Sequence, residues 1–235
     1  MLFMRCKAWG FLLLLMFAFN GCEGEVPVAV NDPEQDEPKP SGPKETGFVP
    51  LTFADFSAFP PMPMPMGDEP TWFISDLGDI QTTGKPRGYL YTKKPYSNFT
   101  FRCEFRFLPE EEPLDAAAMD KYNTGFLIYV PNDHKIWPRS LEVQGRYDQI
   151  GQVKKNARDM EFNGTLDDQA AREKARRPVG EWNAVEIVSK DGAVTAFLNG
   201  EKVSACDPGD VDTGYIGLQA EDFPVEFRNL SIRED

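Results

Sequence analysis

Apolar and polar side chains alternate along residues 98–107, which read NFTFRCEFRF. From position 99 onward every second residue is apolar, and the positions between carry polar or charged side chains. This period of two predicts a β-strand with one face in a core and the other face in solvent. Further strands are expected at 88–92, 125–130, 140–144, 182–189, 193–198, 215–219 and 225–232.

Turn signals separate these runs, among them KDG at 190–192 and NG at 199–200, which are typical of hairpins. Many short strands at close spacing predict an all-β sandwich. Residues 60–66 (PPMPMPM) are expected to form a polyproline-type loop, because proline lacks the N–H that sheet pairing needs.

One segment, residues 165–177 (TLDDQAAREKARR), has the pattern of a short helix. Thr165 is expected to cap its N-terminus, with Asp168 three residues later as in a capping box. Pro178 is expected to end it, because proline cannot continue a helix.

The N-terminal part of the chain has a different texture. Arg5 and Lys7 precede an apolar run from Ala8 to Phe19, which is shorter than the ~20 residues needed to span a bilayer. The run ends in FNGC, which resembles a bacterial lipobox and predicts lipidation of Cys22; an ordinary secretory signal cleaved nearby is the alternative.

The acidic, proline-rich residues that follow Cys22 predict an extended tether, with an edge strand at 26–30 as the alternative. The expected organisation is therefore a signal peptide at 1–21, a tether at 22–47 and one domain at 48–235. Such a chain is exported and held by its lipid at a membrane of the cell envelope, on the periplasmic or the extracellular side.

Charge and composition exclude several classes of partner. The formal net charge is −13, which argues against nucleic acid and against attraction to anionic lipid, so membrane contact is expected through the lipid anchor alone. With a single histidine and no carboxylates at ligand spacing, neither a metal nor a cofactor is expected. A calcium loop at Asp207, Asp210 and Asp212 is the alternative to a simple turn there.

Two cysteines, Cys103 and Cys206, remain once Cys6 and Cys22 are assigned to the signal and the lipid anchor. In an oxidising compartment they could form a disulfide. Cys103 also fits the alternating pattern as a small buried apolar residue, so sequence leaves both readings open.

Three blocks of the sequence resemble one protein family. They are TGKPRGYLYTKKPYSNFTFRCEFRF at 83–107, NTGFLIYV with HKIWPRSLEVQGRYDQIGQV at 123–130 and 134–153, and RRPVGEWNAVEIVSKDGAVTAFLNGEKV with GYIGLQAEDFPVEFRNLSI at 176–203 and 214–232. The blocks are similar to the 3-keto-disaccharide hydrolase domain family. The resemblance implies a concanavalin A-like jelly-roll sandwich and an activity on glycosides oxidised at carbon 3. It also implies functional partnership with a sugar 3-oxidoreductase.

The resemblance extends in fold to laminarinases, whose strand motif Glu-x-Asp-x-x-Glu supplies a nucleophile and an acid/base. Here the corresponding residues are Glu142, Gln144 and Tyr147, so the pair of carboxylates that ordinary retaining glycosidases need is missing. A ketone at carbon 3 acidifies the hydrogen on carbon 2, so that one general base suffices for elimination. We assign that base to Glu142; a structural carboxylate paired with a neighbouring arginine is the alternative.

Other residues near this motif are candidates for substrate contacts. Gln144 is expected to orient a sugar hydroxyl, and Trp137 to stack on a sugar ring unless it belongs to the core. The remaining candidates are Lys85 and Arg87 at the enolate, Arg146, Tyr147 and Asp148 along the cleft, and His134 as an acid/base, each with a solvated or structural role as the alternative. Asn123 is expected to shape a turn, and Trp182 and Arg228 are expected to be structural.

The sequence thus favours a glycoside-cleaving enzyme that acts on 3-keto-glycosides by elimination and hydration, or by net hydrolysis. A non-catalytic, lectin-like carbohydrate-binding module on the same sandwich is the main alternative. A scaffold domain of the cell envelope, which would expose a large apolar patch, is the third.

Overall fold

The computed structural model describes residues 46–61, 70–109 and 114–235. Contacts divide the chain into two units at Pro43 and Lys44, and the second unit, Lys44–Asp235, holds every element described below. The expected signal peptide, Cys22, nearly all of the expected tether and most of the proline-rich loop lie outside the described residues. Within the described part, no helix is long and apolar enough to cross a membrane.

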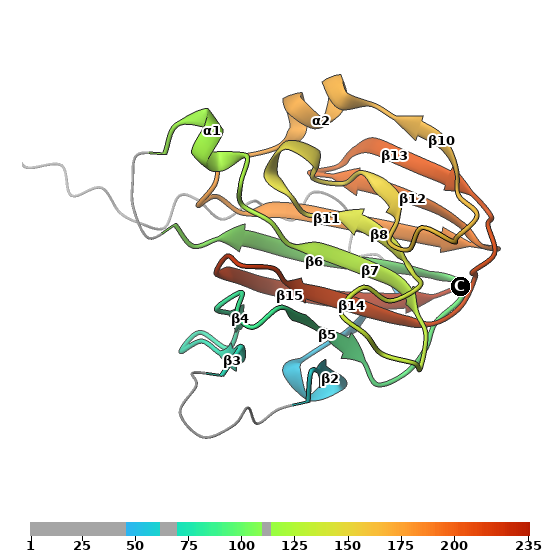
Figure 1. Ribbon diagram of the computed structural model, residues 1–235, viewed down its shortest axis with the longest axis horizontal. Coiled ribbons are helices and arrows are strands. Elements are labelled where there is room, and N and C mark those ends of the chain that lie inside the picture. Colours follow the sequence, from blue (N-terminus) through green and yellow to red (C-terminus); the bar gives the residue numbers. More distant parts are fainter. Residues whose placement is uncertain (1–45, 62–69, 110–113) are drawn as a thin grey trace, which may run out of the picture. The chain divides into compact units, whose positions relative to one another are not determined.

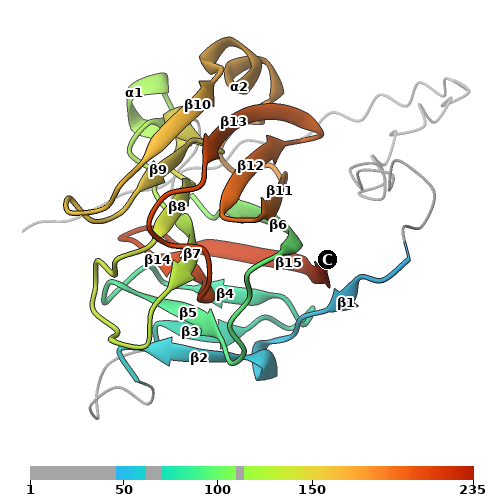
Figure 2. The same cartoon turned by 90° about the vertical axis from the view of Figure 1, so that its right-hand side faces the viewer.

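Two antiparallel sheets form a β-sandwich (Figures 1 and 2), which confirms the all-β, jelly-roll fold class. The larger sheet has nine strands in the order β10-β13-β12-β11-β6-β15-β4-β3, and β1 also pairs with β15. Its strands are β1 Val49–Pro50, β3 Trp72–Ile74, β4 Ile80–Thr82, β6 Phe99–Phe107, β10 Asn163–Asp167, β11 Asn183–Lys190, β12 Ala193–Leu198, β13 Glu201–Asp207 and β15 Val225–Glu234.

The smaller sheet has six strands in the order β2-β5-β14-β7-β8-β9. These strands are β2 Phe56–Phe59, β5 Gly88–Thr92, β7 Gly125–Val130, β8 Leu141–Gln144, β9 Val153–Lys155 and β14 Tyr215–Ala220. The short helices are α1 Ala116–Met119, α2 Gln169–Ala175 and the 3-10 turns Phe53–Asp55 and Tyr147–Gln149.

The alternating residues of β6 supply the centre of the core, as their pattern predicts. Phe105 is fully buried, and its ring lies edge-on to Phe126 of β7 at 5.4 Å between centroids. Phe227 of β15 stacks beside it at 6.4 Å. Aromatic side chains from both sheets therefore interdigitate, and this packing fixes which face of each strand remains available for polar groups.

The predicted helix is shorter than expected, and its cap is a different residue. Thr165 belongs to β10, which pairs with β13, so it does not cap a helix. Asp168 is the cap: its side chain accepts a hydrogen bond from the backbone N–H of Ala171 at 2.9 Å. Pairing with β13 extends the strand to Asp167 and outweighs the local capping-box signal. Helix α1, capped by Asp115, was not predicted.

Cys103 and Cys206 are free thiols, and both are buried. Cys103 lies on the core face of β6 with 2% of its surface exposed, which confirms the prediction of a small buried apolar residue. Burial raises the pKa of the Cys103 thiol well above its ordinary value.

Candidate functional site

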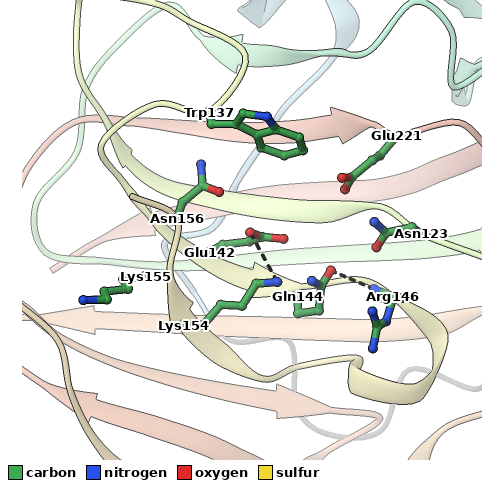
Figure 3. Close-up of a pocket in the computed structure, with 9 residues that line it drawn as sticks. All are labelled: Asn123, Trp137, Glu142, Gln144, Arg146, Lys154, Lys155, Asn156 and Glu221. Atoms are coloured by element: carbon green, nitrogen blue, oxygen red, sulfur yellow. Dashed lines mark hydrogen bonds and ion pairs between the residues drawn. The ribbon is translucent and has the colours of Figure 1, made fainter. Parts of the chain in front are cut away.

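A cavity of about 300 Å³ opens on the face of the six-stranded sheet that points away from the core (Figure 3). Strands β8 and β9 form its floor, and the loop between β7 and β8 contributes Trp137. The residues that line it are Asn123, Trp137, Glu142, Gln144, Arg146, Lys154, Lys155, Asn156 and Glu221.

The alternation of β8 sends two polar side chains to this cavity. Leu141 and Val143 are in the hydrophobic core, and Glu142 and Gln144 take the opposite face, as predicted. In the register of the sheet, Glu142 is opposite Leu127 on β7 and opposite Lys154 on β9. The tertiary pairing therefore brings a lysine beside the candidate base.

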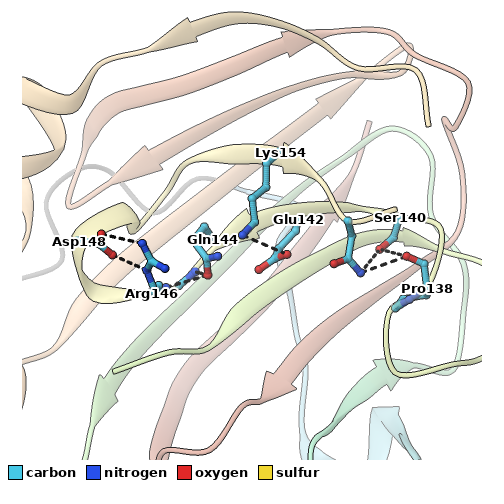
Figure 4. Close-up of polar contacts among 9 residues, drawn as sticks. Pro138, Ser140, Glu142, Gln144, Arg146, Asp148 and Lys154 are labelled. Atoms are coloured by element: carbon cyan, nitrogen blue, oxygen red, sulfur yellow. Dashed lines mark hydrogen bonds and ion pairs between the residues drawn. The ribbon is translucent and has the colours of Figure 1, made fainter. Parts of the chain in front are cut away.

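Glu142 is a buried carboxyl in an incompletely paired environment. Only 3% of its surface is exposed, and its Oε2 lies 3.7 Å from the Nζ of Lys154 (Figures 3 and 4). Burial raises the pKa of Glu142 to about 7, the Lys154 ammonium opposes this, and the charge of Glu221 adds to it. The ion-pair partner of Glu142 is Lys154, whereas the structural alternative expected an arginine.

Gln144 uses its oxygen to hold the chain where β8 ends. Its Oε1 accepts hydrogen bonds from the backbone N–H groups of Gly145 and Arg146, both at 2.9 Å (Figure 4). The side-chain nitrogen is the part of Gln144 left to face a ligand. The predicted role as a hydroxyl-orienting residue therefore falls to this amide N–H alone.

Arg146 lines the cavity and is neutralised within its own turn. Its Nε and Nη2 donate to the two carboxylate oxygens of Asp148 at 2.6 and 2.8 Å (Figure 4). Asp148 is thus occupied by Arg146 and is not among the lining residues. Tyr147 points to the core instead, and the Arg176 guanidinium lies 4.5 Å above its ring.

The GKPRG turn is bonded to the segment directly after β14, next to Glu221 of the cavity lining. Arg87 is hydrogen-bonded to Asp222, with 3.1 Å from its Nε to Oδ1, and Lys85 is exposed. Neither is among the residues that line the cavity, and their predicted role beside an enolate stays a prediction. Arg87 acts at longer range, because its charge lowers the pKa of Glu221 against the larger effect of burial, which raises it.

His134 is packed into an aromatic cluster on the same face of the sheet. Its ring lies 4.0 Å from that of Tyr91, and its Nδ1 is 3.1 Å from the hydroxyl of the fully buried Tyr89. Burial lowers the pKa of His134. The cluster fastens the loop between β7 and β8 to the sheet, and His134 does not line the cavity, so the expectation of an acid/base there is not supported by its position.

Trp137 lies on that same loop and faces the cavity, with 44% of its surface exposed, so it is not a core residue. The side chain of Asn156, next to β9, donates to the carbonyl of Pro138 at 3.1 Å. This hydrogen bond joins the loop between β7 and β8 to the end of β9. The position of Trp137 is consistent with stacking of its ring on a sugar.

Sequence reasoning missed Lys154, Lys155, Asn156 and Glu221 and assigned Asn123 to a turn. These residues come from three separate segments, and their meeting depends on the register of β7, β8, β9 and β14. The only available signal was that each lies within or directly beside a block that resembles the family.

No group of three or more histidine, cysteine or acidic side chains suited to a metal occurs among the described residues. In the loop considered for calcium, Asp210 is paired with Arg139, and Asp207 accepts a hydrogen bond from Asn163 at 3.0 Å. Two of the three acids considered for calcium therefore already have side-chain partners.

Most of the chain matches the model of one protein family. The model of a family described as "3-keto-alpha-glucoside-1,2-lyase-like domain" matches residues 63–233. No curated protein sequence matches the chain. The family match supports a role in acting on carbohydrate.

Solved structures support the fold. Two from Parabacteroides distasonis ATCC 8503, both named as inferred glycosyl hydrolases, are each 21% identical to this chain and cover 80% of it. Their TM-scores are 0.55 and 0.53, and the matches cover 94% and 99% of those chains. At this identity the likeness establishes the sandwich and leaves the chemistry to the site.

Proposed function

The chain belongs to the family of 3-keto-alpha-glucoside-1,2-lyase-like domains, and on this premise we propose that it cleaves 3-keto-glycosides by elimination, with Glu142 as the general base. The observation that carries the proposal is the buried carboxyl of Glu142 in a sugar-sized cavity, with a pKa raised to about 7. A base with a pKa near the working pH combines a sufficient deprotonated fraction with useful proton affinity.

The reaction begins at the hydrogen on carbon 2 of the sugar, which the neighbouring ketone acidifies. The Glu142 carboxylate takes this proton, and the electron pair of the C2–H bond moves into an enolate whose charge lies on the ketone oxygen. Collapse of the enolate forms the C1=C2 double bond and breaks the bond from C1 to the glycosidic oxygen. Water added across the double bond afterwards makes the overall result a hydrolysis.

Lys154 is the cation best placed to stabilise the enolate. Its ammonium lies beside Glu142 on the neighbouring strand, whereas Arg146 is already paired with Asp148. A positive charge beside the reacting atoms stabilises developing negative charge, and it does so more strongly where burial lowers the local dielectric constant. Lys154 therefore takes the role that sequence reasoning gave to Lys85 and Arg87.

Glu221 is the candidate acid for the departing glycosidic oxygen. It lines the same cavity from the segment after β14, and burial raises the pKa of its carboxyl. A carboxyl with a raised pKa holds its proton to a higher pH than an ordinary glutamate does, and it can donate that proton as the C1–O bond breaks. The proposed base, Glu142, and the proposed acid, Glu221, line the same cavity.

The origin of the substrate and the location of the protein remain part of this proposal. A 3-keto-glycoside requires an oxidoreductase that removes two electrons and two protons from the C3 carbinol of a glycoside. The sequence around Cys22 supports export and lipid anchoring, so the partner oxidoreductase would share the cell envelope or supply a diffusible keto-sugar.

The test is an assay of the purified protein on glucosides and on their 3-keto counterparts, with mass spectrometry to detect the released aglycone and an unsaturated keto-sugar. Release from the keto forms alone, lost in Glu142→Gln, is expected. Glu186→Gln is the matched control, since Glu186 is a glutamate on the opposite sheet that pairs with Arg102. Cleavage of the parent glucosides, or full activity of Glu142→Gln, contradicts the proposal.

A carbohydrate-binding module is the second candidate, and the exposed Trp137 at the cavity favours it. An indole face can hold a sugar ring without any turnover. Saturable binding of sugars that depends on Trp137, together with no cleavage of any keto-glycoside, would favour this candidate.

A further inference from the structure

The side chains of Glu142 and Gln219 converge over Gly125. Gln219 lies on β14 and Glu142 on β8, with β7 between them. A Cβ atom on Gly125 would lie 2.0 Å from Oε1 of Gln219 and 2.8 Å from Oε1 of Glu142. Because Gly125 has no side chain, both oxygens can lie in the space above it.

The amide oxygen of Gln219 is buried and has no hydrogen-bond donor in the described structure. Only 3% of the surface of Gln219 is exposed. Its backbone carbonyl is held by the hydroxyl of Thr124 at 2.8 Å, so β14 and β7 are fastened together at this point. A buried carbonyl oxygen without a donor destabilises a protein, so such an oxygen calls for a physical explanation.

A candidate donor is the carboxyl of Glu142, whose Oε1 also borders the space above Gly125. An ionised carboxylate only accepts hydrogen bonds, whereas a neutral carboxylic acid carries one O–H donor. Two oxygen acceptors directed at one point repel each other unless a proton lies between them. The arrangement is therefore the one that a neutral Glu142 would adopt.

We propose that Gln219 is a positioning residue for Glu142, and that its amide oxygen accepts a hydrogen bond from the proton that neutral Glu142 carries on Oε1. This interaction stabilises the acid form and thereby increases the proton affinity of the carboxylate. The inference deepens the proposed function, because it identifies what tunes the general base.

Charged groups from each neighbouring element act on Glu142 as well. Lys154 on β9 favours the ionised form, and Glu221 beyond β14 favours the neutral form. Arg146 beyond β8 lines the same cavity but is paired with Asp148. The ammonium of Lys155 is bonded to the carbonyls of Arg158 and Met160, and is thereby directed away from Glu142.

The experiment is a pH titration of the Glu142 side-chain ¹³C carboxyl resonance by NMR, assigned by its absence in Glu142→Gln. In Gln219→Leu, the acceptor and the negative end of the amide dipole are both removed, so the pKa of Glu142 is expected to fall by about one unit. Gln81→Leu makes the same substitution on the opposite sheet and is expected to leave this titration unchanged.

An unchanged pKa in Gln219→Leu overturns the proposal. A pKa that rises also overturns it, because it would show that the amide nitrogen donates to the ionised carboxylate. A second variant, Gly125→Ala, places a methyl group where the two oxygens meet and is expected to shift the titration in the same direction as Gln219→Leu. Circular dichroism establishes that each variant remains folded.

The titration requires no substrate, so its result is independent of whether the protein cleaves keto-glycosides. If turnover is found, the acidic limb of its pH profile is expected to move with the NMR value. A purely structural Gln219 would lower stability without moving either pKa.

Discussion

Two buried glutamates, Glu142 and Glu226, lie on the outer faces of the two sheets, and each has a glutamine from another strand close by. Glu226 on β15 is 2% exposed, accepts from Nε2 of Gln81 at 2.7 Å and from Nε of Arg106 at 2.8 Å. Glu142 is 3% exposed and has an ammonium at 3.7 Å, and its Oε1 borders the same space above Gly125 as Oε1 of Gln219. The two carboxyls are thus equally buried, but Glu226 has a hydrogen-bond donor at each oxygen, whereas Glu142 has a more distant ammonium.

Further cations and an aromatic ring surround Glu226. The guanidinium groups of Arg106 and Arg228 lie 4.6 and 4.0 Å from the ring centre of Trp182, and Arg228 donates to Glu104 at 2.8 Å. This confirms the structural roles predicted for Trp182 and Arg228. The nine-stranded sheet pairs its buried carboxyl with a guanidinium group, whereas burial raises the pKa of the carboxyl on the six-stranded sheet.

The largest effect is expected on the turnover of a 3-keto-glycoside, when Glu142 is replaced. Removal of the general base in Glu142→Gln is expected to reduce kcat by about 10²–10⁴-fold. In the unmodified protein, the rate is expected to rise with pH through about 7, because the carboxylate is the active form. Initial rates measured between pH 5 and 9 check both points, and a flat acidic limb would contradict the assignment of Glu142.

The free energy of unfolding should fall with rising pH through Glu142, because the pKa of this carboxyl is raised in the folded protein. The folded protein binds this proton more tightly than the unfolded chain, so stability is lost as the pH rises from the unfolded value of 4.5 to about 7. Glu142→Gln removes this loss. Its free energy of unfolding is expected to exceed that of the unmodified protein by about 3 kcal/mol at pH 8 and to equal it near pH 4. Urea unfolding at the two pH values provides the measurement.

On the nine-stranded sheet, removal of a partner of the buried carboxyl should lower the stability of the protein. Arg106→Met leaves the Glu226 carboxylate buried with Gln81 as its remaining donor, and is expected to lower the free energy of unfolding by about 2 kcal/mol. Lys154→Met, the corresponding change beside Glu142, is expected to have a smaller effect on stability. Equal losses in the two variants would mean that Glu142 is paired as fully as Glu226.

The smallest expected effect concerns ligand contact at the rim of the cavity. Trp137→Ala removes an exposed ring and is expected to weaken sugar binding by about 1 kcal/mol, close to a fivefold increase in Kd. Phe73→Ala, which removes an exposed aromatic ring on β3, is the control. Calorimetric titration with a keto-sugar checks the prediction, and unchanged affinity would exclude stacking on Trp137.

Sequence reasoning succeeded where the local pattern decides the structure. The alternation of β6 and β8 established which side chains enter the core, and it directed Glu142 and Gln144 to the opposite face. It expected Tyr147 along the cleft, whereas Tyr147 packs in the core, and it did not find Lys154, because adjacency in sequence does not establish which strand lies next to which. Thr165 failed for a related reason, since pairing with β13 outweighs a local capping signal.

The sequence by itself determined the fold class, the family and the identity of the candidate base, because hydrophobic periodicity and motif residues are local properties of the chain. Only the tertiary structure decided the surroundings of that base. The ammonium of Lys154, the amide oxygen of Gln219 and the gap at Gly125 come from different strands, and strand register alone brings them to one carboxyl. Burial and pairing set a pKa, and both are properties of neighbours in space rather than in sequence.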